Sequence, residues 1–165
     1  MRLIRRWTFL LIVLAIPCLV FSRAHIPCLR PDGKSLMLEL INPNEGTEGC
    51  IFKLWLYNDY NAVFEYVTRD GVYRHSFISN AAYGRRHEVV EWLLNKGADP
   101  NPSGQSPLHE AIVREDWELA AKLVKAGTKW TALLDSGETV RGWAVKKYPQ
   151  GMDEIERRVN ASGQN

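Results

Sequence analysis

The chain has 165 residues, of which 45% are hydrophobic and 24% are charged, a length that suits one domain and a composition that excludes a disordered or collagen-like chain. Lys and Arg outnumber Asp and Glu by 21 to 19, but four of the basic residues and no acidic one fall within residues 1–24. The remainder is slightly acidic, which excludes a nucleic-acid partner that is bound through a surplus of cations.

Residues 1–24 have the pattern of a secretory signal peptide. Three arginines at positions 2–6 form a charged start, an apolar run follows at 7–21, and the small residues Ser22 and Ala24 end the segment. The alternative is an uncleaved membrane anchor, but the run is shorter than the roughly 20 residues that a membrane span needs. We therefore expect a periplasmic or secreted protein, and the sequence does not decide its export route. The alternative is a protein anchored in the membrane by residues 7–21.

Two of the three cysteines, Cys28 and Cys50, lie beyond this segment. An even number of cysteines in an oxidising compartment predicts a disulfide between them. The alternative is a pair of unpaired thiols. The sequence has no Cys-x-x-Cys pair and no Cys/His cluster with metal-ligand spacing, so we expect no metal site and no cofactor.

Residues 25–49 read mostly as loop. Prolines and glycines recur through this segment, including the turn-forming sequence Asn42-Pro43-Asn44. Within it, Ser35–Ile41 is the one stretch that fits a short strand.

From residue 50 onward the chain contains a repeated unit. Residues 76–97 and 106–127 align at an offset of 30, with Ala, Glu, Leu and Gly at matching positions. Residues 63–71 align with 89–97 at an offset of 26, and residues 104–111 align with 137–144 at an offset of 33. One unit is therefore reused with loops of different length.

Each unit reads as two short helices. The hydroxyl of Ser106 can accept a hydrogen bond from a free helix N–H, and Pro107 fits the first turn because its missing N–H costs nothing there. Asp116 begins a second helix, along which apolar residues between 119 and 124 form one face.

Small residues mark the helix ends and the helix contacts. Glycine is the least strained residue just after a helix, and the second helices of three units end at Gly71, Gly97 and Gly127. Two short helices cannot bury both of their faces alone, so we expect the units to stack. The residues that let the helices approach closely are Ala81, Ala111 and Ala144.

These residues resemble the ankyrin-repeat family. Ser106-Pro107-Leu108-His109-x-Ala111 is close to the family's TPLHxA motif, and Gly97-Ala98-Asp99-Pro100-Asn101 is similar to its GADxN turn. The resemblance implies an all-α, ankyrin-type solenoid of about four helix-turn-helix repeats with short loops. It places the ankyrin-repeat domain at 50–160, with units at 50–71, 74–103, 104–136 and 137–160 and a polar tail at 161–165.

The loops between units depart from the family. Ankyrin repeats carry β-hairpin fingers, and the loops at 71–76 and 97–106 are too short for a full one, so we expect a full-length finger only at 127–139. Residues 25–49 have no counterpart in the family. We expect them to form a small irregular N-terminal cap that the bridge to Cys50 holds over the first helix.

The resemblance also implies a partner-binding surface, because ankyrin stacks bind with the finger tips and the exposed side of each first helix. Aromatic and arginine side chains dominate binding hot spots. The candidate partner-binding residues are Tyr73, Arg74, Asn80, Tyr83, Gln105, Glu110, Val113, Arg114, Trp130 and Trp143. The alternative for Trp130 and Trp143 is packing against neighbouring repeats.

No pattern in the sequence carries catalytic chemistry. His109 lies near Ser106, but the family implies that this histidine hydrogen-bonds across repeat turns, and the segment lacks the final glycine of a nucleophile elbow. His75 and His87 have no carboxylate at ligand spacing. We therefore expect no enzyme activity.

The sequence thus predicts a non-catalytic module that binds one protein partner, with membrane contact only through an uncleaved N-terminal segment. Small exported bacterial proteins of this design are similar to immunity proteins that neutralise a toxin in the periplasm, so the partner hypothesis is a toxin or hydrolase. The alternatives are an envelope scaffold or protective partner of another periplasmic protein, and an enzyme whose site these patterns do not reveal.

Overall fold

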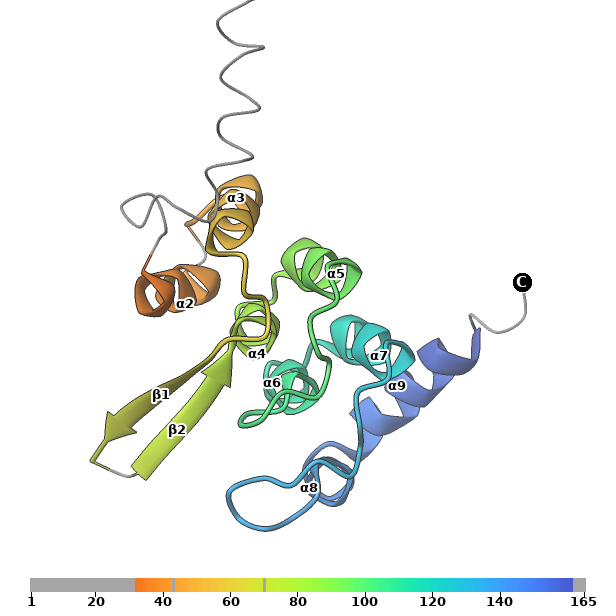
Figure 1. The fold of residues 1–165 in the computed structure, drawn as a ribbon. Helices are drawn as coiled ribbons and strands as arrows, with labels where there is room; N and C mark the ends of the chain where they lie inside the picture. Colours follow the sequence, from red (N-terminus) through yellow and green to blue (C-terminus); the bar gives the residue numbers. More distant parts are fainter. Residues whose placement is uncertain (1–31, 43, 70, 162–165) are drawn as a thin grey trace, which may run out of the picture.

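The structure is a computed structural model that describes residues 32–42, 44–69 and 71–161. This part of the chain holds eight helices and one two-stranded sheet, and the helices follow one another as four consecutive pairs (Figure 1). The predicted signal peptide or anchor, Cys28 and the last four residues of the polar tail lie outside the described residues.

The first helix pair corrects the prediction of an irregular cap. Helix α2 spans Gly33–Ile41 and helix α3 spans Thr47–Tyr57. The sequence predicted a loop with a short strand at Ser35–Ile41, and it placed the first unit at 50–71. The stack therefore begins earlier than predicted, because α2 packs against the first helix of the next pair.

Two features of the sequence explain α2. Leu36, Met37 and Leu40 are buried, which is the spacing of one helix face rather than the alternation of a strand. Asp32 caps the helix, since its carboxylate accepts a hydrogen bond from the backbone N–H of Ser35 at 2.9 Å.

A β-hairpin follows the first pair and corrects the all-α prediction. Strands β1 (Val63–Thr68) and β2 (Gly71–Ser76) pair in antiparallel register, where the sequence predicted a second helix ending at Gly71. Val, Phe, Tyr and Thr dominate β1, and such residues favour a pleated, half-buried strand. The alignment at an offset of 26 therefore did not mark a repeat.

The hairpin also corrects the predicted finger lengths. The junction at 71–76, which was expected to be short, is the second strand of the hairpin between the first and second helix pairs. The segment at 127–139, expected to be the only full finger, contains turns and one isolated bridge between Leu133 and Thr139.

The three later units each hold one helix pair at the expected place. Their bounds are α4 Phe77–Tyr83, α5 His87–Asn95, α6 Pro107–Val113, α7 Trp117–Lys125, α8 Val140–Lys147 and α9 Pro149–Ala161.

The predicted helix ends in these units are confirmed. Ser106 accepts a hydrogen bond from the backbone N–H of His109 at 3.5 Å, and Asp116 accepts one from Leu119 at 3.1 Å. Gly97 and Gly127 follow α5 and α7 in the left-handed region, with φ of 82° and 92°.

The helices form two layers (Figure 1). Helices α2, α4, α6 and α8 lie side by side as the first layer, and α3, α5, α7 and α9 form the second. The predicted contact residues Ala81, Ala111 and Ala144 are buried in the first layer. No helix in the described ranges combines the length and the apolar composition that a membrane crossing needs.

Candidate protein-binding surface

An open cleft of about 370 Å³ lies where the hairpin meets the first layer of helices. We call it the hairpin cleft. Its lining residues are Leu38 and Ile41 of α2, Tyr66 of β1, His75 of β2, Asn80 and Tyr83 of α4, and Glu110 of α6. Four parts of the fold thus converge on one site, and three of the lining residues, Asn80, Tyr83 and Glu110, were predicted as partner-binding.

Apolar side chains near this site are exposed to solvent. Leu38, Ile41 and Tyr83 are exposed on the cleft walls, although each is large and apolar or aromatic. At the end of the hairpin, Val67 and Val72 face each other in the strand register and are 81% and 56% exposed. Contiguous exposed apolar surface is characteristic of protein interaction sites.

Three polar residues of the cleft, Glu110, Tyr66 and His75, have a polar atom without a close partner among the described residues. Glu110 is only 7% exposed, and the nearest basic atom to its carboxylate is Nδ1 of His109 at 3.8 Å, beyond hydrogen-bond distance. Among the described residues, the Tyr66 hydroxyl and Nδ1 of His75 are also buried without a hydrogen bond. Burial raises the pKa of Tyr66, and the nearby charge of Asp32 raises it further.

Two of the predicted residues have clear contacts within the chain. The side-chain amide of Asn80 donates a hydrogen bond to the backbone carbonyl of Met37 at 3.0 Å, which ties α4 to α2. The guanidinium of Arg114, just after α6, lies 4.8 Å from the ring centroid of Tyr83. This is a cation–π contact at the edge of the cleft.

The predicted finger residues connect the hairpin to the loops that follow. Arg74 in β2 forms an ion pair with Glu65 at 2.7 Å, and its backbone carbonyl accepts a hydrogen bond from the N–H of Gln105 at 2.8 Å. The Gln105 amide donates to Asp135 at 3.2 Å, and Tyr73 lies half-buried in β2. These residues lie outside the cleft lining.

The remaining candidates pack partly within the stack. Trp130 and Trp143 are half-buried against the core, and Val113 is half-buried at the end of α6. The ring of Trp143 lies 4.6 Å from that of His109 and 5.6 Å from that of Tyr148. Trp143 therefore packs against a neighbouring repeat unit, which is the alternative that the sequence analysis left open for this residue.

The resemblance implied that His109 hydrogen-bonds across repeat turns, and the structure bears on one of its two ring nitrogens, Nδ1. Within the described part of the chain this atom is buried without a hydrogen-bond partner, and the ring packs against Trp143 instead.

Sequence reasoning missed four of the seven cleft residues. Leu38 and Ile41 are three residues apart on one face of α2, a helical signal that was hidden by the prediction of a loop and strand. Tyr66 and His75 were missed because their segment was assigned to a helix and a short junction rather than to a hairpin.

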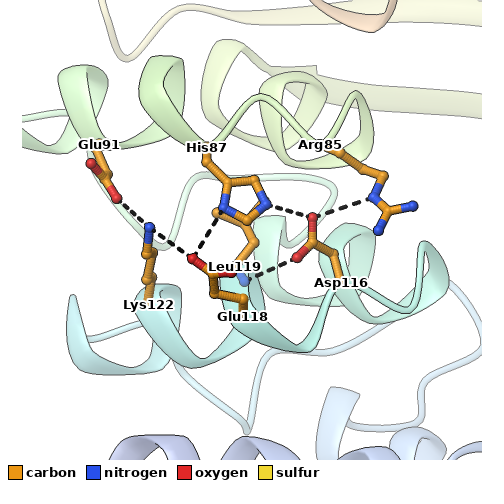
Figure 2. Close-up of polar contacts among 7 residues, drawn as sticks. All are labelled: Arg85, His87, Glu91, Asp116, Glu118, Leu119 and Lys122. Carbon is orange, nitrogen blue, oxygen red and sulfur yellow. Dashed lines mark hydrogen bonds and ion pairs between the residues drawn. The ribbon is translucent and has the colours of Figure 1, made fainter. Parts of the chain in front are cut away.

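The structure also pairs His87 with a carboxylate, although the sequence showed none at a suitable spacing. Figure 2 shows a polar network between α5 and α7 in the second layer. Nε2 of His87 lies 2.7 Å from Asp116, and Nε of Arg85 lies 3.4 Å from the same carboxylate oxygen. Lys122 then bridges Glu91 at 2.6 Å and Glu118 at 3.3 Å.

Asp116 is the buried centre of this network, with 5% of its surface exposed. Burial by itself raises the pKa of this carboxyl, but the hydrogen bonds from His87 and from the Leu119 N–H, with the charge of Arg85, outweigh it and hold the pKa below its ordinary value. Through these contacts the network ties the helix pair α4–α5 to the pair α6–α7.

Cys50, the described member of the predicted disulfide, has a free thiol in the structure. It is buried in α3, and this burial raises the pKa of the thiol. The Cys28–Cys50 bridge stays a prediction, made for a chain in an oxidising compartment. Alkylation after unfolding without a reductant should then leave both residues unlabelled, and alkylation after reduction should label both, as measured by peptide mass spectrometry. Labelling of Cys50 before reduction would contradict the bridge.

Among the described residues, no group of three or more His, Cys, Asp or Glu side chains is placed to hold a metal ion.

Comparison with known proteins identifies the repeat. Residues 78–124, from α4 to α7, match the family model described as ankyrin repeats (many copies). No curated protein matches the chain. Ankyrin repeats generally mediate protein–protein interactions and are typically non-enzymatic. The matched segment covers nearly all of the helix pairs α4–α5 and α6–α7, and it contains the confirmed caps Ser106 and Asp116 and the glycine Gly97. Residues 78–124 of the chain are therefore similar to ankyrin repeats.

Proposed function

We propose that this protein is a non-catalytic module that binds one protein partner through the hairpin cleft and the exposed tip of the hairpin. The observation that carries the proposal is the convergence of α2, the hairpin, α4 and α6 on one open cleft with exposed apolar walls. Aromatic anchors in a partly desolvated pocket are the usual centre of a protein interface.

The finer proposal concerns place and partner. The charged start, apolar run and small-residue exit of residues 1–24 support export to the periplasm or beyond. In that compartment we propose an immunity or inhibitor role, in which the cleft and hairpin cover a secreted toxin or hydrolase. A protein that must neutralise one enzyme needs a preformed surface of this kind rather than chemistry of its own.

The test is affinity purification of the full chain, tagged at its C-terminus, from the envelope of its own cells, with bound proteins identified by mass spectrometry. We expect one stoichiometric partner with hydrolase or toxin activity, which the purified chain inhibits. A stoichiometric partner without such activity would support binding but contradict the immunity role. A scatter of weak partners would favour an envelope scaffold.

Two single variants locate the binding surface. We expect Tyr83→Ala and Leu38→Ser each to weaken partner binding about tenfold or more, because interface anchors contribute about 2 kcal/mol or more when truncated. Their melting temperatures should change little, since both side chains are exposed. The matched control is Phe52→Ser, which removes an exposed apolar side chain from α3 in the second layer. Equal loss of binding in all three variants would contradict the proposed surface.

A further inference from the structure

The chemistry of the hairpin cleft indicates which side chain of the partner it holds. This inference deepens the proposed function and depends on it, because it names the group that the partner presents. The cleft volume of about 370 Å³ lies at the lower end of the range for small-ligand sites, roughly 300–1,000 Å³, which suits a single large side chain better than a helix.

The one acidic group of the cleft lacks a cation. Glu110 is only 7% exposed, and His109 is the only basic side chain among the described residues within 4 Å of its carboxylate. Arg114 belongs to the same turn, but its guanidinium is held over the Tyr83 ring and forms no ion pair with Glu110 in the described part of the chain. A carboxylate removed from water is stabilised by an opposite charge, so this position attracts a cation.

The walls of the cleft suit a long, flat cation. Tyr66, His75 and Tyr83 supply aromatic faces, and Leu38 and Ile41 supply aliphatic surface. The chain itself demonstrates that a guanidinium fits against one of these rings, since Arg114 lies 4.8 Å from the Tyr83 centroid. Stacking on aromatic rings and weak hydration distinguish a guanidinium from an ammonium group.

We infer that the hairpin cleft binds the side chain of an arginine on the surface of the protein partner. The aliphatic part of that arginine lies along Leu38 and Ile41, and its guanidinium donates hydrogen bonds to the Glu110 carboxylate. A guanidinium has five N–H donors in a planar fork, so it can donate to both oxygens of one carboxylate.

The test uses capped pentapeptides with the sequence Ala-Leu-X-Leu-Ala, in which X is arginine, lysine or citrulline. Citrulline keeps the shape of arginine but has no charge. Each peptide is titrated into the ¹⁵N-labelled full chain and followed by NMR. We expect the arginine peptide to shift the amide signals of Leu38, Tyr83 and Glu110 in a saturable way.

The citrulline peptide should bind about tenfold more weakly, because a hydrogen bond to a charged group contributes about 1.5–3 kcal/mol. Equal binding of the arginine and citrulline peptides would overturn the inference, as would shifts confined to other parts of the chain or no shift with any peptide. A stronger response to lysine than to arginine would show a cation site of a different kind and would also overturn it.

Two charge variants complete the test. Glu110→Gln should remove the preference for arginine over citrulline, whereas Glu88→Gln, which removes an exposed carboxylate from α5 in the second layer, should leave the preference unchanged. A preference that survives Glu110→Gln would overturn the role of this carboxylate. Retained binding of a purified protein partner to the Glu110→Gln chain would leave the proposed function standing and refute only the arginine site. Selective arginine binding without any protein partner would leave the arginine site standing and refute the proposed function.

Discussion

Replacement of Gly84 with alanine is expected to lower the free energy of unfolding by about 2–3 kcal/mol, the upper part of the usual range for overpacking. Gly84 follows α4, where α2 crosses closely. A Cβ atom at this position would lie 2.2 Å from the backbone carbonyl oxygen of Leu40 and 3.2 Å from Cα of Ile41. Both contacts are with backbone atoms, which no side-chain rotation can relieve. The whole of α2 must therefore move away from α4 to make room.

The same substitution should weaken partner binding. Leu38 and Ile41 form the α2 side of the hairpin cleft, so displacement of α2 from α4 removes that wall. Unfolding in urea measures the first effect, and hydrogen exchange at the backbone amides of α2 shows which helix has moved.

Gly49→Ala is the matched control. Gly49 lies within α3, and no atom lies within 4 Å of the position of its added Cβ. Alanine is a better helix former than glycine by roughly 0.5–1 kcal/mol, so this variant should be as stable as the wild type or slightly more stable. If Gly84→Ala were also as stable as the wild type, the close packing of α2 on α4 would be contradicted.

The second large effect is expected at Asp116. Asp116→Ala should lower the free energy of unfolding by about 2–3 kcal/mol, because it removes a helix cap, typically worth about 1 kcal/mol, and leaves two buried or half-buried donors without their acceptor. Those donors are the Leu119 N–H and the ring of His87. Chemical unfolding at neutral pH measures the loss.

The control for Asp116 is Glu118→Gln, two residues further along the chain in the same network. Glu118 is exposed and pairs with Lys122 at the surface, where an ion pair contributes little, so we expect a change below about 0.5 kcal/mol. Similar losses in both variants would mean that the network acts through surface charge rather than through the buried carboxylate.

The lowered pKa of Asp116 also predicts a pH dependence. The folded-state pKa lies below the unfolded value, which is close to the ordinary 3.8 for an aspartate. The carboxylate therefore stabilises the fold fully above that pH, and the contribution is lost as the pH falls through the folded-state pKa. The stabilities of the wild type and of Asp116→Asn should converge as acid is added. A constant difference down to the acid limit would contradict this assignment.

Three of the seven cleft residues could be predicted from the repeat alone. Asn80 and Glu110 occupy equivalent positions in the first helices of adjacent units, and Tyr83 lies one turn further along its helix. Residues on one helix face point to one side of a stack, so the register of the motif is enough to bring them together. The same register could not reveal that the Asn80 amide is occupied by the Met37 carbonyl.

The N-terminal third of the described chain could not be predicted in this way. Short apolar segments are compatible with a helix or a strand, and the surroundings decide between them. Helix α2 is stabilised by its packing on α4, and β1 by the contacts of Phe64 with Tyr57 and Phe77. None of these partners is adjacent in the sequence, so local propensity misassigned both segments.

The sequence by itself determined the local features of this protein: the caps at Ser106 and Asp116, the helix ends at Gly97 and Gly127, and the motif of the ankyrin repeat. Each depends on hydrogen bonds or backbone geometry within a few residues. Only the tertiary structure decided where the stack begins, which residues line the cleft, and that His87 meets Asp116 although 29 residues separate them. Those features arise where packed elements distant in the chain meet, and pattern within a single segment carries no information about such contacts.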